Sequence, residues 1–282
     1  MFIIKLFIVF CASCIICAND AMALSTNNVI ITDVAPVQFS VVWSTNEASS
    51  CSLVVFSDPA AVNDISSQLM IISESRDHPP AEENGVMKVT VKKLSKLTTY
   101  YFKTISISKT DHKTYLSDQI FSVTTENESG VVQNNILVQK IFECDGLSFS
   151  RGTLMIVNHQ DASYPLSAFT GDGFPEGYAG VDLMNFYHKS TRKPLEIDEY
   201  GSSVSVNAFG GLLGYASTKA IVDESISTQV INNAAILSRL KDIIPVLQIL
   251  SGLIPESQPC LYDMNKNNRY ELFEVLNALK NL

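Results

Sequence analysis

The sequence has little histidine, tryptophan and basic charge for its length. Four histidines and one tryptophan occur in 282 residues, and charged residues make up 17% of the chain. Acidic residues outnumber basic ones, which gives a formal net charge of -9, and the basic residues form no block. A negative chain of this kind repels the phosphates of nucleic acids and the head groups of anionic lipids, so neither is expected as a partner.

The sequence also lacks the signatures of the common catalytic centres. It contains no Gly-x-Ser-x-Gly elbow, no His-Glu-x-x-His pair and no Gly-Lys-Ser/Thr of a phosphate loop. Its glycine clusters, Gly171-x-Gly173 and Gly210-Gly211, do not lie between a strand and a helix, so they predict turns. An active site assembled by distant parts of the chain stays open, but the sequence favours a protein that is not an enzyme.

Cysteine is sparse after the N-terminal region. Three of the six cysteines lie within the first 17 residues, which leaves Cys51, Cys144 and Cys260, far apart and odd in number. This spacing excludes a scaffold stapled by several disulfides, and it excludes a zinc knuckle, which needs close pairs. At most one bridge can form among the three, and buried free thiols are the alternative.

The N-terminus carries the longest apolar run. Lys5 precedes an apolar core at Leu6–Ala18 that is too short for a comfortable membrane span, and Ala21-Met22-Ala23 offers a small-x-small cleavage site. We therefore predict a signal peptide over residues 1–23 and a secreted protein, located outside the cell, on its surface or in a periplasm. A lipoprotein acylated at Cys11, Cys14 or Cys17 is the alternative. No later run is long and apolar enough to span a bilayer.

Residues 24–125 show the pattern of short antiparallel strands. Phe39, Val41 and Trp43 alternate with Ser40, Val42 and Ser44, which predicts a strand with one buried and one solvated face. Further strands are expected at 51–56, 87–91, 99–107 and 119–124, with turn residues between them. The pattern predicts an antiparallel β-sandwich with Trp43 in its core.

Two stretches of this region resemble a fibronectin type III domain. Ile31-Thr32-Asp33-Val34 followed by Phe39-Ser40-Val41-Val42-Trp43-Ser44-Thr45 is similar to its first strands. Val89-Thr90-Val91, Leu94 and Leu97-Thr98-Thr99-Tyr100-Tyr101-Phe102 are similar to its fifth strand and tyrosine corner. In that corner a tyrosine hydroxyl hydrogen-bonds to the backbone just upstream, and Tyr100 is the candidate. The resemblance covers residues 24–125 and implies a fold without a chemistry.

Residues 131–227 continue the strand pattern. Strand-like runs at 136–142 and 152–158 are separated by Asp145-Gly146, a turn signal, and further runs follow near 164–170, 181–183 and 203–206 before Gly210-Gly211 marks the end. This order is similar to the transthyretin-like sandwiches called carboxypeptidase regulatory-like domains of exported bacterial proteins. The resemblance implies a second antiparallel sandwich that acts as a stabilising or binding module.

The periodicity changes from about residue 228. Leu237, Leu240, Ile244, Leu247 and Leu250 recur at intervals of three and four, which predicts an amphipathic helix. Pro245 is expected to kink this helix or to delay its start. A second, short helix is expected after Glu274, so that residues 228–282 form a small helical pair.

A loop between these helices has the spacing of an EF-hand calcium site. Asp263-Met264-Asn265-Lys266-Asn267 begins a twelve-residue stretch that ends on the carboxylate of Glu274. A hard cation takes about six to eight oxygens, and alternate residues of a tight loop supply them. The stretch predicts one weak Ca²⁺ site, of the ~10⁻⁴–10⁻³ M class, because amides replace carboxylates and Asn268 stands where glycine is usual. A plain asparagine-rich turn is the alternative. The predicted ligands are the side chains of Asp263, Asn265, Asn267 and Glu274, the backbone carbonyl of Arg269, and Glu271 through water.

The C-terminal segment as a whole resembles a dockerin module. Dockerins pair two loop–helix repeats and dock onto cohesin receptors, but residues 231–241 lack the ligands of a first loop, so one calcium ion is expected. A cohesin-like partner therefore stays open beside an intramolecular helical cap.

The sequence predicts a mainly β fold, with two consecutive antiparallel β-sandwiches and a small helical pair. It predicts a secreted, non-catalytic binding or assembly protein whose partner is a protein or a surface polysaccharide. The alternative is an extracellular hydrolase, or an accessory subunit of a polysaccharide- or peptide-degrading system.

Overall fold

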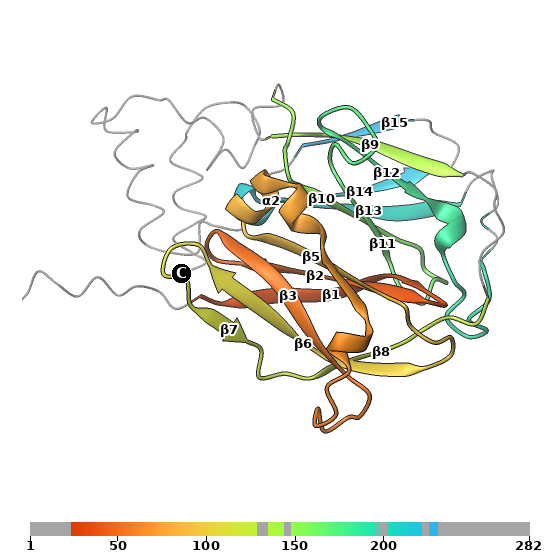
Figure 1. Ribbon diagram of the computed structural model, residues 1–282. Helices are drawn as coiled ribbons and strands as arrows, with labels where there is room; N and C mark the ends of the chain where they lie inside the picture. Colours follow the sequence, from red (N-terminus) through yellow and green to blue (C-terminus); the bar gives the residue numbers. More distant parts are fainter. Residues whose placement is uncertain are drawn as a thin grey trace, which may run out of the picture.

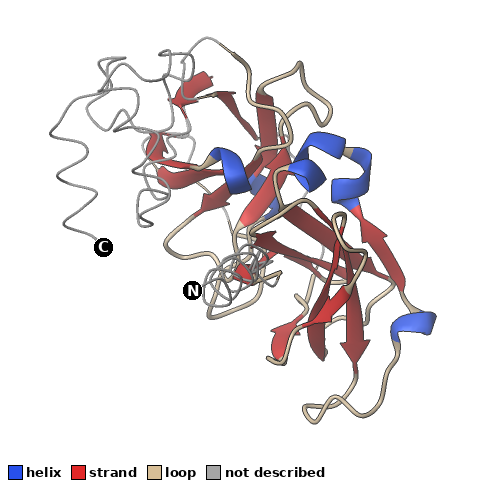
Figure 2. Cartoon of the chain, turned by 90° about the vertical axis from the view of Figure 1, so that its left-hand side faces the viewer, coloured by secondary structure: helices blue, strands red, loops and turns tan. Residues whose placement is uncertain are grey.

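Strands in four stacked sheets make up most of the computed structural model, which describes residues 24–128, 135–143, 148–195, 197, 202–221 and 226–230 (Figure 1). The helices among them are short (Figure 2). The mainly β fold built from antiparallel sandwiches is thus confirmed. The signal peptide, Cys144, Cys260, the calcium loop and residues 231–282 of the predicted helical pair lie outside the described residues.

The first sandwich has the strand order of an immunoglobulin-like domain. One sheet runs β1-β2-β5-β4, and the facing sheet runs β3-β6-β7, with β8 also paired to β6. This is the ABED and CFG arrangement of the constant-type immunoglobulin fold. The elements are β1 (Thr26–Ala35), β2 (Gln38–Thr45), β3 (Ser49–Phe56), η1 (Ser66–Gln68), β4 (Met70–Ser73), η2 (Glu74–Asp77), α2 (Pro79–Glu83), β5 (Val86–Lys92), β6 (Thr99–Ser108), β7 (Thr114–Leu116) and β8 (Phe121–Thr124).

The core of this sandwich forms on the face of β2 that the sequence predicted to be buried. Phe39, Val41 and Trp43 are fully buried against residues of the facing sheet, including Phe102. The indole Nε1 of Trp43 donates a hydrogen bond to Ser106 Oγ at 2.9 Å, so its one polar atom is satisfied inside the core. Trp43 is therefore the core residue that the sequence predicted.

The tyrosine corner is also present. Tyr100 is 7% exposed, and its hydroxyl oxygen accepts a hydrogen bond of 2.9 Å from the backbone N–H of Ser95, five residues upstream. The bond ties the connection between β5 and β6 to the second of these strands, as the resemblance implied.

Replacing Tyr100 by phenylalanine should lower the free energy of unfolding by about 1–2 kcal/mol, because the Ser95 N–H loses its partner while the ring stays in place. Urea unfolding followed by Trp43 fluorescence measures the change. Tyr101→Phe is the matched control, since the adjacent Tyr101 is only half-buried; an equal loss in both variants would contradict the corner's role.

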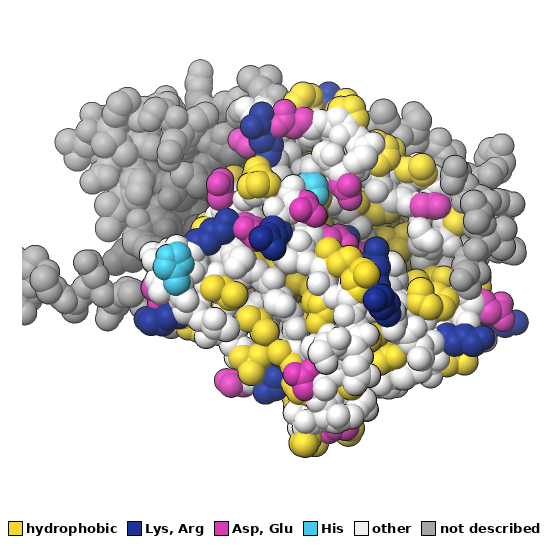
Figure 3. All heavy atoms as spheres, viewed as in Figure 1, with side chains coloured by type: hydrophobic (Ala, Val, Ile, Leu, Met, Phe, Trp, Pro, Cys, Tyr) yellow, Lys and Arg dark blue, Asp and Glu magenta, His cyan; other side chains and the backbone are white. Residues whose placement is uncertain are grey.

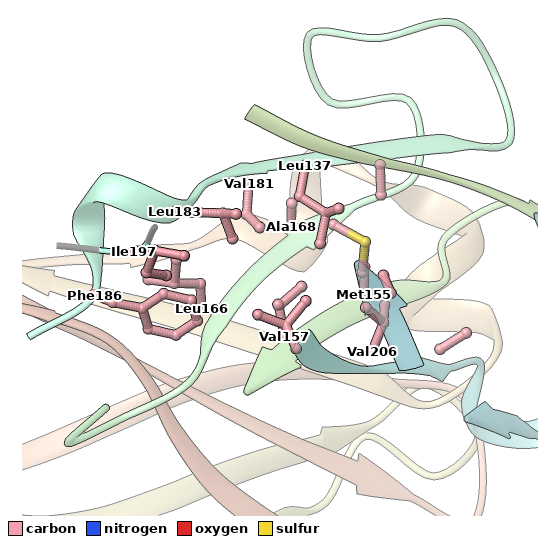
Figure 4. Packing of buried hydrophobic residues seen from close by; sticks show 14 of the residues in the cluster. Leu137, Met155, Val157, Leu166, Ala168, Val181, Leu183, Phe186, Ile197 and Val206 are labelled. Carbon is pink, nitrogen blue, oxygen red and sulfur yellow. The ribbon is translucent and has the colours of Figure 1, made fainter. Parts of the chain in front are cut away.

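The second sandwich pairs a four-stranded sheet, β11-β10-β13-β14, with a three-stranded sheet, β12-β9-β15. Its core contains Met155, Val157 and Val206 from the first sheet and Leu137 and Val181 from the second (Figure 4). The sequence predicted that strands end at Gly210-Gly211, but the chain turns there into β14 and later adds β15 parallel to β9. The elements are β9 (Ile136–Phe142), β10 (Leu154–Asn158), β11 (Leu166–Phe169), β12 (Tyr178–Asp182), η3 (Leu183–Asn185), β13 (Ser203–Phe209), η4 (Gly211–Leu213), β14 (Tyr215–Ile221) and β15 (Ile226–Val230).

The two sandwiches pack face to face, and this overturns the prediction of a solvated face on β2. The outer face of β1-β2-β5-β4 lies against the outer face of β11-β10-β13-β14 (Figure 1). Seven buried residues form the apolar part of the interface: Val42, Ala81, Val86, Leu154, Ile156, Phe169 and Phe209. At Gly211, which has a φ of 58°, an added Cβ would lie 2.1 Å from the carbonyl oxygen of Asn84, so a side chain there would push the sandwiches apart.

A buried ionic network forms the polar part of the interface. Lys88 on β5 points into the second sandwich, where its Nζ lies 3.2 Å from Asp33 Oδ2, 3.0 Å from Glu74 Oε2 and 3.1 Å from the Ser167 carbonyl oxygen. Burial lowers the pKa of Lys88, but the carboxylates of Asp33 and Glu74 raise it by more, so the net shift is upward and the ammonium stays charged.

A β-bulge aims Asp33 at the second sandwich. The register of β1 shifts between Thr32 and Ala35, and Asp33 adopts a φ of 52°, a left-handed conformation that aspartate tolerates. Its Oδ1 accepts a hydrogen bond from the Ser167 N–H at 2.7 Å, and its Oδ2 accepts one from the Ser167 hydroxyl at 2.6 Å. One carboxylate therefore binds Lys88 of the first sandwich and β11 of the second.

Glu126 makes a separate tie between the sandwiches. This side chain, just after β8, is fully buried, and its Oε1 accepts a hydrogen bond from Ser163 Oγ at 2.7 Å and lies 3.7 Å from Arg192 Nη1. Burial raises the pKa of its carboxyl group above the ordinary range. With the Lys88 network and the apolar cluster, this contact joins the two sandwiches into one unit.

Candidate binding surface

Three aromatic rings surround a lysine on the outer face of the sheet β12-β9-β15. The Nζ of Lys140 lies 4.7 Å from the ring centroid of Phe142, 5.3 Å from that of Phe149 and 5.6 Å from that of Tyr178. All three distances are within the ~6 Å range of a cation–π contact. We call these four residues the aromatic–lysine cluster.

The alternation of β9 places two members of the cluster on the outer face. Leu137, Gln139 and Ile141 are buried toward the core, so Lys140 and Phe142 point the other way. Tyr178 on β12 is the direct antiparallel partner of Lys140, which brings its ring to the same face.

Phe149 completes the cluster from the chain that follows β9. It forms an antiparallel bridge with Phe142, and their rings stack at 5.3 Å with an interplanar angle of 18°. Gly177 has a φ of 78°, and an added Cβ there would lie 2.5 Å from Phe149 Cδ1. The Phe149 side chain thus packs against the backbone at Gly177, a position where an added side chain would displace it.

The cluster is partly open to solvent. Phe149 is 38% exposed and Ile136, on the same strand as Lys140, is 49% exposed. Figure 3 shows hydrophobic side chains among charged ones at the top of the view, where Figure 1 places β9. Arg151 follows Phe149 closely in the sequence and Glu176 precedes Tyr178, and these two charged residues form an ion pair with each other. A contiguous group of exposed apolar side chains marks a candidate interaction surface.

Two clefts also open among the described residues, where the sandwiches meet. The first, of about 280 Å³, is lined by residues that include Asp33, Ser167 and Asp182, and the second, of about 360 Å³, by residues that include His78 and Arg151. Asp33 is engaged with Lys88, and Asp182 Oδ1 accepts a hydrogen bond from the Met184 N–H at 3.1 Å. These carboxylates are therefore committed to the fold.

No group of three or more His, Cys, Asp or Glu side chains is arranged to hold a metal ion in the described ranges. His78, for example, belongs to no such group, and its ring packs against that of Phe169, with 4.5 Å between the ring centroids. The predicted calcium ligands Asp263, Asn265, Asn267, Arg269, Glu271 and Glu274 all lie outside those ranges. The structure therefore leaves the calcium prediction as the sequence made it.

Cys51 is a buried free thiol, as one of the two sequence alternatives held. Burial raises its pKa to about 11, so it is protonated and weakly nucleophilic at neutral pH. As for membrane insertion, the described part of the chain contains no helix with the length and apolar character of a bilayer span.

Comparison with known proteins gives distant structural matches. No family model matches the chain, and no curated protein matches it. Among solved structures, the chain is similar to the FN1–FN3 domains of chicken CNTN1, with 13% identity over 73% of this chain and 66% of that one and a TM-score of 0.25. It is also similar to a chimeric titin Z1Z2, with 9% identity over 74% and 98% and a TM-score of 0.22. A third match is Dpr11 IG1 bound to DIP-gamma IG+IG2, with 7% identity over 74% and 99% and a TM-score of 0.21.

These matches do not superpose closely on the whole chain. The assignment of the first sandwich to the immunoglobulin-like and fibronectin type III-like folds rests instead on its strand order and its tyrosine corner.

Sequence reasoning missed the aromatic–lysine cluster. Lys140 and Phe142 already alternate with buried residues in the sequence, which marks their face, but Phe149 and Tyr178 come from separate segments. Nothing in the local pattern indicates that these rings converge.

Proposed function

We propose that this protein is a secreted, non-catalytic binding protein that holds a protein partner on the aromatic–lysine cluster. The observation that supports the proposal is the gathering of three rings and a lysine on the outer face of a sheet. Aromatic side chains supply much of the binding energy at protein interfaces. The two sandwiches pack into one unit that supports this surface. Because the surface is already ordered, binding costs less conformational entropy.

Truncation of the cluster tests this proposal. Phe149→Ala and Tyr178→Ala should each weaken capture of the partner from the source's culture fluid by roughly thirtyfold, the effect of losing a hot spot worth ~2 kcal/mol. Tyr215→Ala is the matched control, because Tyr215 is 47% exposed on β14, which belongs to the other sheet of the second sandwich. Unchanged capture by both cluster variants would refute the proposal. Capture of a polysaccharide by the wild-type chain would favour the other partner class.

The calcium loop is a second part of the proposed function. We propose that Asp263 and Glu274 anchor one Ca²⁺ ion and that the ion orders a C-terminal docking module. The support is the spacing of oxygen-bearing side chains from Asp263 to Glu274.

Titration of the full chain with Ca²⁺ measures this site directly. The wild type should bind one ion with a Kd of about 10⁻⁴–10⁻³ M, and Asp263→Asn combined with Glu274→Gln should abolish the heat of binding. Asp172→Asn, at an exposed loop position, should leave it unchanged. Absence of heat with the wild type at several millimolar Ca²⁺ would dismiss the site.

A further inference from the structure

We infer that the aromatic–lysine cluster is a binding site for an organic cation, an ammonium or guanidinium group of the partner, and that Lys140 fills this site in the free protein. The inference rests on the proposed function and names the chemistry of its partner, a basic protein segment. Its basis is that one ammonium group lies within 5.6 Å of the centroids of three rings that come from three segments of the chain.

The rings bind a cation because of their charge distribution. Each aromatic face carries partial negative charge, so several faces directed at one point attract a positive group and repel an anion. The rings of Phe142, Phe149 and Tyr178 all lie within cation–π range of the Lys140 ammonium group, so they are partners that hold it there.

Backbone contacts place the three ring-bearing residues next to one another. Tyr178 is held by strand pairing, Phe149 by its bridge to Phe142, and Gly177 leaves the space that the Phe149 ring occupies. Lys140 is instead a long side chain with four rotatable bonds. The ammonium group of Lys140 can leave the rings at a small cost in free energy. The three rings would then remain as an empty cation site.

The charge of the chain agrees with a basic partner. The formal net charge of -9 attracts cationic segments to the chain as a whole. A lysine or arginine of the partner would replace Lys140 among the rings and release that side chain to solvent.

Opening the cation site by mutation tests the inference without knowledge of the partner. Lys140→Ala removes the internal occupant, and tetramethylammonium serves as the probe, with tert-butanol as a neutral probe of similar size. In nuclear magnetic resonance titrations, Lys140→Ala should bind tetramethylammonium with a Kd on the order of 10 mM, with shifts at Phe142, Phe149 and Tyr178. The wild type should bind at least tenfold more weakly.

Two controls make the result decisive. Lys219→Ala, on the exposed edge strand β14, should behave as the wild type, and Lys140→Ala combined with Phe149→Ala should lose binding. Lys140→Gln provides a second opened variant, and Trp43 fluorescence reports whether each variant is folded. Equal responses to both probes, no response of either opened variant, or binding that survives the loss of Phe149 would each overturn the inference. Loss of partner capture by Phe149→Ala together with no tetramethylammonium binding would keep the proposed function and reject the cation.

Discussion

Replacing Lys88 by methionine should lower the free energy of unfolding by about 3–5 kcal/mol. Lys88 is 6% exposed, and its ammonium group is the cation between the carboxylates of Asp33 and Glu74. Methionine fills much of the same volume but leaves two negative charges facing each other at the interface. Chemical denaturation followed by Trp43 fluorescence measures the loss.

Two comparison variants separate the lost charge from lost packing. Lys92→Met, at the exposed end of the same strand, should cost less than about 0.5 kcal/mol. Combining Lys88→Met with Asp33→Asn and Glu74→Gln removes all three charges and should recover a large part of the stability. A triple variant no more stable than Lys88→Met would show that packing, and not unpaired charge, sets the cost.

The pH dependence of the Lys88 contribution has a definite sign. The folded-state pKa of Lys88 lies above its ordinary value of 10.5, so the folded protein holds this proton more tightly than the unfolded chain. The contribution is fully present below pH 10.5 and is lost as the pH rises through the folded-state pKa. Above pH 10.5 the wild type should therefore lose the advantage that it has over Lys88→Met.

Replacing Phe169 by alanine should destabilise both sandwiches together, by about 3–5 kcal/mol. Phe169 belongs to β11 of the second sandwich, is 1% exposed, and packs in the apolar cluster between the sandwiches. Since the interface couples the two halves, the loss should appear in Trp43 fluorescence, which reports the first sandwich.

The measurement is the urea midpoint by two probes, Trp43 fluorescence and far-ultraviolet circular dichroism. Both should shift equally with an unchanged slope, as expected for one cooperative transition. Leu212→Ala, at a position 42% exposed, is the control and should shift neither probe measurably. A Trp43 transition that stays at the wild-type midpoint while the other moves would show that the sandwiches unfold independently.

The sequence by itself determined the features that arise from local periodicity and short spacings. Alternation marked the core face of β2 and the position of Trp43, and the run ending in Tyr100 marked a corner whose hydrogen bond spans five residues. The run at 136–142 matches β9 residue for residue. These features depend on neighbours within a strand or a turn, so the pattern of residue types specifies them.

Only the tertiary structure decided what covers each face. Ser40, Lys88 and Thr90 lie on polar faces that local alternation assigns to solvent, yet the second sandwich buries them. Asp33 and Ser167 meet across 134 residues of sequence, and Phe149 joins Lys140 through a bridge to Phe142. A period of two distinguishes the faces of a strand, but the partner of a face is set by sheet-on-sheet packing and register, to which residues far apart contribute together.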